Sequence, residues 1–122
     1  MGLAVAVGGA GALGAVARYL VDSAVQRRRR GPFPLGTLLV NLVGSLVLGL
    51  LAGLALTHAH STTARTVIGT GFCGGLTTWS TAAWETVRLA QDGMTATSVR
   101  FTVVNLVGSF AIAAAGLLVF LH

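Results

Sequence analysis

The sequence predicts an all-α membrane protein with four transmembrane helices, and three observations support this fold class. Hydrophobic residues make up 54% of the 122 residues and charged residues only 9%, which is too few to cover a soluble globule with a polar surface. Four apolar stretches are long enough to cross a bilayer core of about 30 Å as helices. The connections between these stretches are too short to form a soluble domain. We therefore expect a single transmembrane domain in the cell membrane.

The four predicted spans cover residues 3–21, 35–57, 66–86 and 100–121. Helices are expected because backbone N–H and C=O groups in lipid need partners within the protein. The formal net charge of +5 does not indicate nucleic-acid binding, because the arginines cluster between apolar runs as they do in membrane loops. The single cysteine, Cys73, excludes an internal disulfide framework.

The arginines of the predicted connections are unevenly distributed. Those after the first and third spans are Arg27, Arg28, Arg29, Arg30, Arg88 and Arg100. The connection between the second and third spans carries only Arg65, and the terminal tails carry no arginine. Because positive residues in short loops stay cytoplasmic, this bias predicts that both termini lie outside the cell.

The third span has an unusual composition for a membrane helix. Its glycines are Gly69, Gly71, Gly74 and Gly75. The polar residues that follow them are Thr77, Thr78, Ser80 and Thr81. Glycine costs about 1 kcal/mol per site in a helix, and irregular backbone at membrane depth is tolerated where it is buried or lines a water-filled path. We predict a break between residues 74 and 78, of the kind that exposes backbone groups to ions. A continuous, closely packed helix is the alternative.

A six-residue segment occurs twice. Residues 40–45, Val-Asn-Leu-Val-Gly-Ser, recur as residues 104–109. Each copy places an asparagine and a serine four residues apart on one helical face. The polar side chains of the two columns, extended by one threonine, are Thr37, Asn41, Ser45, Asn105 and Ser109. Such residues often join helices in membranes, but two identical columns in so apolar a chain favour a polar track.

Two further features bear on function. Arg18 lies about one turn from the predicted membrane edge, where an arginine either reaches the headgroups or raises the anion concentration at a pore mouth.

Residues 9–14 match the G-x-G-x-x-G pattern, but the chain lacks the acidic residue and the amphipathic helices of a nucleotide-binding fold. No Ser-His-Asp set or pair of buried carboxylates is present, so the sequence does not predict an enzyme.

Several blocks occur in an order that resembles a known family. They are Gly14-Ala15, Arg18-Tyr19, residues 36–41 (Gly-Thr-Leu-Leu-Val-Asn), residues 71–78 (Gly-Phe-Cys-Gly-Gly-Leu-Thr-Thr), Ser80-Thr81 and Glu85. Together they resemble the CrcB/Fluc fluoride channels over nearly the whole chain. That family forms antiparallel dimers of four-helix subunits, with two fluoride pores and a buried sodium ion. The resemblance implies a channel that exports fluoride and lowers its cytoplasmic concentration.

The resemblance also implies roles for particular residues. The main-chain carbonyls of Gly74 and Thr77 would hold the sodium ion. The residues implied to line the anion path are Arg18, Thr37, Asn41, Trp79, Ser80, Thr81, Asn105 and Ser109. Asn, Ser and Thr donate hydrogen bonds that replace the water around a small anion without trapping it by opposite charge. Aromatic ring edges also carry positive partial charge.

The chain departs from the family at residues 77–82. The family pattern is Thr-Thr-Phe-Ser-Thr-Phe, whereas this chain has Trp79 at the first ring position and Ala82 at the second. Some family members form heterodimers in which one subunit has lost part of its pore. Both a homodimer and a pair with a homologous chain therefore remain open. The arginine bias and Ala82 suggest an oppositely oriented sister chain, whereas an arginine run that merely contacts anionic lipid would allow both orientations and a homodimer.

Two alternative functions remain. A small dual-topology multidrug exporter also has four spans and pairs in antiparallel orientation, but it needs a glutamate in its first span, where this chain has Arg18 and no acid. A non-conducting partner subunit would be expected to lose its polar columns, which this sequence retains.

Overall fold

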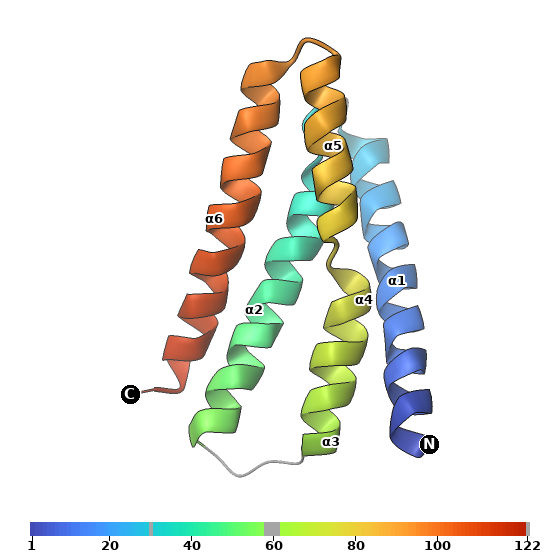
Figure 1. Ribbon diagram of the computed structural model, residues 1–122, viewed down its shortest axis with the longest axis vertical. Coiled ribbons are helices and arrows are strands. Elements are labelled where there is room, and N and C mark those ends of the chain that lie inside the picture. Colours follow the sequence, from blue (N-terminus) through green and yellow to red (C-terminus); the bar gives the residue numbers. More distant parts are fainter. Residues whose placement is uncertain (30, 58–61, 122) are drawn as a thin grey trace.

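Helices form nearly all of the computed structural model, which describes residues 1–29, 31–57 and 62–121. Three of them are long: α1 (Gly2–Arg28), α2 (Leu35–Thr57) and α6 (Thr95–Val119). A fourth, interrupted rod consists of α3 (Thr62–Arg65), the π-helix η1 (Thr66–Cys73), α4 (Gly74–Leu76) and α5 (Trp79–Gln91). These four rods stand side by side (Figure 1). The predicted all-α class is confirmed, and Arg30 lies outside the described residues.

Within the described residues, α1, α2 and α6 are each long and apolar enough to cross a membrane alone. The third predicted span corresponds to the interrupted rod. Its helix stops at Leu76 and restarts at Trp79, so the predicted break is confirmed. The extended residues are Thr77 and Thr78, with φ/ψ of −79°/157° and −149°/122°, whereas Gly74 is helical. The break is therefore made by the two threonines and not by the glycine.

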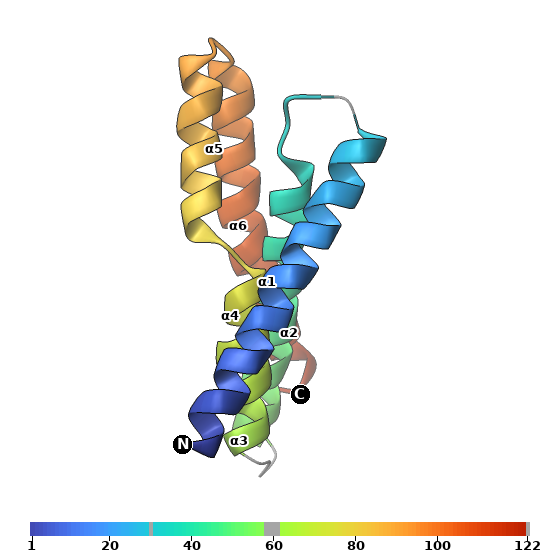
Figure 2. The same ribbon diagram turned by 90° about the vertical axis from the view of Figure 1, so that its right-hand side faces the viewer.

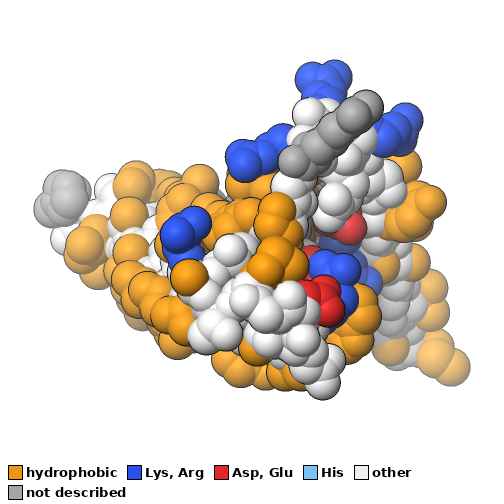
Figure 3. All heavy atoms as spheres, turned by 90° about the horizontal axis from the view of Figure 1, so that it is seen from above, with side chains coloured by type: hydrophobic (Ala, Val, Ile, Leu, Met, Phe, Trp, Pro, Cys, Tyr) orange, Lys and Arg blue, Asp and Glu red, His pale blue; other side chains and the backbone are white. Residues whose placement is uncertain are grey.

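Both termini lie at one end of the bundle, and the α1–α2 connection and the α5–α6 turn lie at the other (Figures 1 and 2). The α5–α6 turn contains Gly93, whose φ of 81° is unfavourable for residues with a side chain. Viewed from this second end, arginine and acidic side chains gather on the surface (Figure 3). The arginine-rich connections of the sequence thus lie at the end of the molecule opposite the two termini.

Helix packing relies on close backbone approach. A Cβ atom added at Gly14 of α1 would overlap the Phe72 carbonyl oxygen, and one at Gly75 would overlap that of Gly11. Between the parallel helices α2 and α6, a Cβ at Gly49 would overlap the carbonyl of Ala113. Without a hydrophobic driving force in lipid, close packing at small residues contributes to helix association together with interhelical hydrogen bonds.

The α5–α6 pair is joined by side chains near the turn. Ser98 Oγ donates to the Thr86 carbonyl oxygen at 2.7 Å, and the hydroxyls of Thr86 and Thr102 lie 3.1 Å apart. Beside them, Phe101 is fully buried and meets Phe33 edge to face, with ring centroids 5.7 Å apart. The hydrogen bonds fix α5 to α6 beyond the break, and the ring contact joins α6 to the α1–α2 connection.

The glycine contacts predict an effect on stability. We expect Gly14→Ala to lower the free energy of unfolding by about 1–3 kcal/mol, because the added methyl forces α1 away from the Phe72 carbonyl. Gly9→Ala, in the same helix, meets nothing within 4 Å and should have no such effect. Thermal unfolding of both variants in one detergent checks this, and equal stability would contradict the packing described.

Candidate functional site

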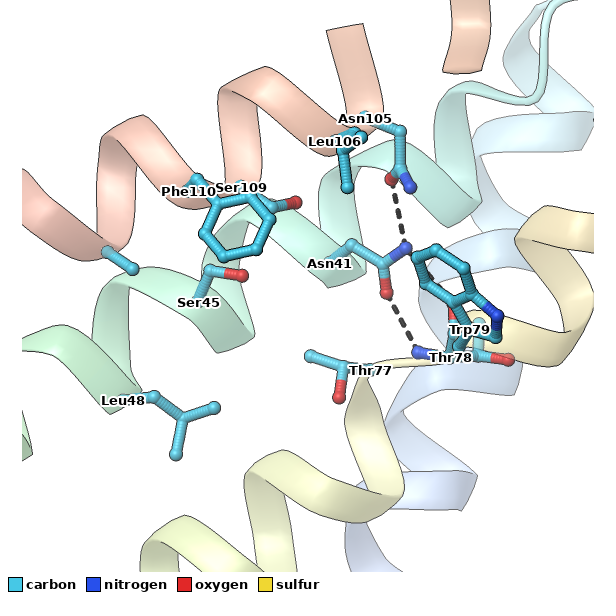
Figure 4. A pocket seen from close by; sticks show the side chains of 11 residues that line it. Asn41, Ser45, Leu48, Thr77, Thr78, Trp79, Asn105, Leu106, Ser109 and Phe110 are labelled. Atoms are coloured by element: carbon cyan, nitrogen blue, oxygen red, sulfur yellow. Dashed lines mark hydrogen bonds between the residues drawn. The ribbon is translucent and has the colours of Figure 1, made fainter. Parts of the chain in front are cut away.

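The side chain of Asn41 connects three helical elements at the level of the break. Its Oδ1 accepts from the Thr78 amide at 2.8 Å, and its Nδ2 donates to the Thr78 carbonyl at 3.1 Å and to Asn105 Oδ1 at 2.9 Å (Figure 4). We call these three hydrogen bonds the Asn41 bridge. The bridge satisfies backbone groups that the interrupted helix leaves open, which is obligatory at membrane depth. It also joins α2 to α6 through the two asparagines of the repeated segment.

Thr78 has a second role as the N-cap of α5. Its side-chain oxygen accepts from the Thr81 amide at 3.0 Å, which satisfies one open donor of the new helix. Ser80 Oγ lies 3.5 Å from the same oxygen. The polar residues after the break thus include those that restart the helix.

A cavity of about 300 Å³ lies on one side of the Asn41 bridge, and we call it the central cavity. Its lining residues are Asn41, Ser45, Leu48, Thr77, Thr78, Trp79, Asn105, Leu106, Ser109, Phe110 and Ala113 (Figure 4). The two polar columns of the repeat meet here, as the sequence predicted. Ser109 Oγ is buried and has no hydrogen-bond partner among the described residues, so it is free to donate to a ligand. No described lining residue is charged.

A second cavity of about 200 Å³, the Arg18 cavity, lies between α1, α2 and the start of α5. Its polar lining residues are Arg18, Tyr19, Asp22, Thr37, Thr78 and Thr81. Thr78 lines both cavities, so the Asn41 bridge stands between them. Of the residues predicted to line an anion path, three lie in the Arg18 cavity, four in the central cavity, and Ser80 lines neither.

Two acidic residues belong to this region and were not predicted as site residues. Glu85 is buried and accepts a hydrogen bond from the Thr37 hydroxyl, so that hydroxyl is already engaged. Asp22 lines the Arg18 cavity, and its side chain packs against the backbone of Gly36. The signal that identifies Glu85 in the sequence is its position inside a predicted span, because ionisable residues there are rare and usually functional.

The residues implied to hold sodium are compatible with a cation of that kind. In a continuous helix the Gly74 carbonyl would accept from the Thr78 amide, but that amide donates to Asn41 instead. Thr77 is extended, so its carbonyl leaves the helix direction. Both groups are neutral oxygen donors, the ligand type that hard cations prefer. Bound there, a cation would balance the partial negative charge at the end of α4.

The two ring positions of the family pattern differ in environment. Trp79 is 74% exposed at the rim of the central cavity. Ala82 is buried among Leu38, Leu89 and Phe101 and also lines an apolar cavity of about 280 Å³ between α5 and α6. At the position where the family pattern has a second aromatic ring, this chain therefore has Ala82 and an unfilled cavity next to the central cavity.

The fold and this site define a multi-pass membrane protein with a path of polar side chains through a helix break. The chain belongs to the family described as CrcB-like protein, Camphor Resistance (CrcB), which it matches over residues 3–117.

Curated relatives agree with that assignment. "Fluoride-specific ion channel FluC 1" of Leifsonia xyli subsp. xyli is 53% identical over 90 residues, covering 74% of this chain and 64% of the relative. The protein of the same name from Frankia casuarinae is 45% identical over 112 residues, covering 85% of this chain and 87% of the relative. "Fluoride-specific ion channel FluC 2" of Mycobacterium bovis is 44% identical over 106 residues, covering 87% and 81%. The aligned stretch thus spans less than two thirds of the Leifsonia relative.

The Asn41 bridge predicts a stability difference between two neighbouring polar positions. We expect Asn41→Leu to lower the free energy of unfolding by about 1–3 kcal/mol, because it leaves the buried Thr78 amide without a partner. Ser45→Ala, one turn along α2, should cost less than about 1 kcal/mol. Thermal unfolding, with hydrogen exchange at Thr78, checks this. Unchanged exchange in Asn41→Leu would contradict the bridge.

Proposed function

We propose that this chain is a subunit of a fluoride-selective channel that exports fluoride and lowers its cytoplasmic concentration. The observation that carries the proposal is the pair of cavities joined at the Asn41 bridge. The Arg18 cavity holds a positive charge that attracts anions. The central cavity offers neutral hydrogen-bond donors, and none of its described lining residues is charged. The names of the relatives, which are fluoride-specific ion channels, support the same ion.

The chemistry of the central cavity suits a small, strongly hydrated anion. Fluoride gives up its water only where hydrogen-bond donors replace it, and Ser109 and Asn105 bring such groups to one space. A fixed positive charge there would hold the ion too tightly for conduction. Passive conduction is sufficient for export, because hydrogen fluoride enters cells neutral and ionises inside.

A structural sodium ion at the carbonyls of Gly74 and Thr77 is part of the proposal. Its support is the break itself, which directs the Thr78 amide to Asn41 and leaves the Gly74 carbonyl without that helical partner. The ion would stabilise the end of α4 and take no part in anion movement.

We further propose a second subunit in antiparallel orientation. The support is the central cavity, two of whose lining residues, Trp79 and Phe110, are 74% and 72% exposed in the single subunit and are available to a partner. The partner is either a second copy or a homologous chain. The arginine difference between the two ends and the open volume at Ala82 favour a homologous chain with the missing ring.

Anion release from vesicles tests the function. Purified protein in liposomes loaded with fluoride or chloride should release fluoride at least about 100-fold faster than chloride, because chloride is larger and the donors are placed for a small ion. An ion-selective electrode measures both rates. Equal release of the two anions, or proton-driven export of organic cations, would overturn the assignment.

Two further conditions extend that measurement. If a homologous partner is required, the chain alone should release no fluoride, and adding the partner should restore release.

Preparing the protein without sodium should lower its thermal stability and its fluoride release together. Full release in sodium-free protein would remove the cation from the proposal.

The acidic residue of the Arg18 cavity, Asp22, predicts that the rate of fluoride release depends on the charge of this cavity. Asp22→Asn should raise fluoride release about two- to fivefold at about 10 mM salt and less at about 300 mM salt, because it removes a negative charge from the approach of the anion. Arg18→Gln should have the opposite effect.

The matched control is Asp92→Asn, which makes the same charge change at the α5 C-cap, outside the lining of that cavity. If Asp22→Asn and Asp92→Asn alter the rate equally, the effect is one of net charge and the Arg18 cavity is not on the path.

A further inference from the structure

A third polar cavity lies at the opposite end of the bundle from the Arg18 cavity. It has a volume of about 260 Å³ and opens between the last turns of α2 and the first turns of the third span. The α2 wall is wholly apolar, with Leu48, Leu51, Ala52 and Ala55. The facing wall presents Thr62, Arg65, Thr66 and Thr70. We call it the Arg65 cavity.

Arg65 is incompletely satisfied in this cavity. Its Nη2 donates to Thr62 Oγ1 at 3.3 Å, while its Nε is buried and has no hydrogen-bond partner among the described residues. A guanidinium carries several N–H donors in a fork that fits two oxygens of one anion. Burial of such a donor without an acceptor is costly, so the arrangement favours an acceptor from beyond the described residues.

None of the chain's acidic side chains is placed to pair with Arg65. Its three acids are Asp22, Glu85 and Asp92. Asp22 lies in the Arg18 cavity, Glu85 accepts from Thr37, and Asp92 caps α5 at the far end. Arg65 can therefore accept an anion from another molecule without competing with an acidic side chain of its own chain.

The walls of the Arg65 cavity identify the kind of molecule. The cavity lies where two membrane-spanning segments begin and end, at the level expected for lipid headgroups. An arginine with neighbouring hydroxyls suits a phosphate, and an adjoining apolar wall suits an acyl chain. We propose that the Arg65 cavity binds one phosphate-bearing anionic lipid per subunit, with its acyl chain along Leu48, Leu51 and Ala52. This site shares Leu48 with the central cavity, but its polar residues are not among those proposed to line the anion path, and the proposal does not depend on that path.

Native mass spectrometry of the detergent-solubilised full chain tests the site. After exchange with phosphatidylglycerol, wild-type protein should retain about one lipid per chain. Arg65→Gln should lower retention at least about fivefold, as expected for loss of one interfacial arginine. Arg100→Gln, which removes an exposed arginine at the other end of the bundle, is the matched control and should leave retention unchanged. Equal retention in wild type and Arg65→Gln would overturn the proposal.

A second variant and a second probe complete the test. Ala52→Leu fills the apolar wall without changing charge, so it should also reduce retention, and it serves if Arg65→Gln fails to fold. Unchanged retention in Ala52→Leu contradicts the lipid site. Displacement of the lipid by inorganic phosphate at equal concentration would assign the cavity to a free anion. Dissociation of subunits in Arg65→Gln with lipid retention intact would assign Arg65 to a carboxylate of the partner. Either result overturns the lipid proposal.

Discussion

The structure depends on how the backbone is satisfied at the break of the third span. Two extended threonines at membrane depth leave amides and carbonyls without helical partners, and lipid offers no replacement. The Asn41 side chain supplies both a donor and an acceptor to Thr78, as another peptide group would. Because the same side chain reaches Asn105, the position of α6 relative to the break is set by the same group.

This arrangement explains why the two cavities adjoin. The break ends α4 and starts α5 in a different direction, so that α5 leans with α6 away from α1 (Figure 2). The space on one side of the Asn41 bridge becomes the Arg18 cavity, and the space on the other becomes the central cavity. Charged groups are confined to the first. One hydrogen-bonded residue, Asn41, thus separates a cavity that contains charged side chains from a cavity whose described lining is uncharged.

Much of this could be predicted from the sequence, because membrane helices follow composition closely. The break followed from the glycines and threonines of the third span, and the meeting of the two asparagines followed from the repeated segment. The π-helical turns of η1, which pack closely against α1, could not be predicted, since the composition of the third span does not distinguish them from α-helical turns. Nor could the Thr37–Glu85 hydrogen bond, which joins residues 48 positions apart and depends on the direction of α5 after the break.

The repeated segment has a consequence for the symmetry of the central cavity. Because α2 and α6 run parallel, the two copies lie at one depth and give the central cavity matching walls. One turn earlier the match ends, since Thr37 of α2 corresponds to Phe101 of α6, which is buried in the core. Seen from the two ends of the bundle, the lining of the proposed path therefore differs. Two identical antiparallel subunits would present both orders of lining to each side of the membrane, whereas a pair of different chains would not.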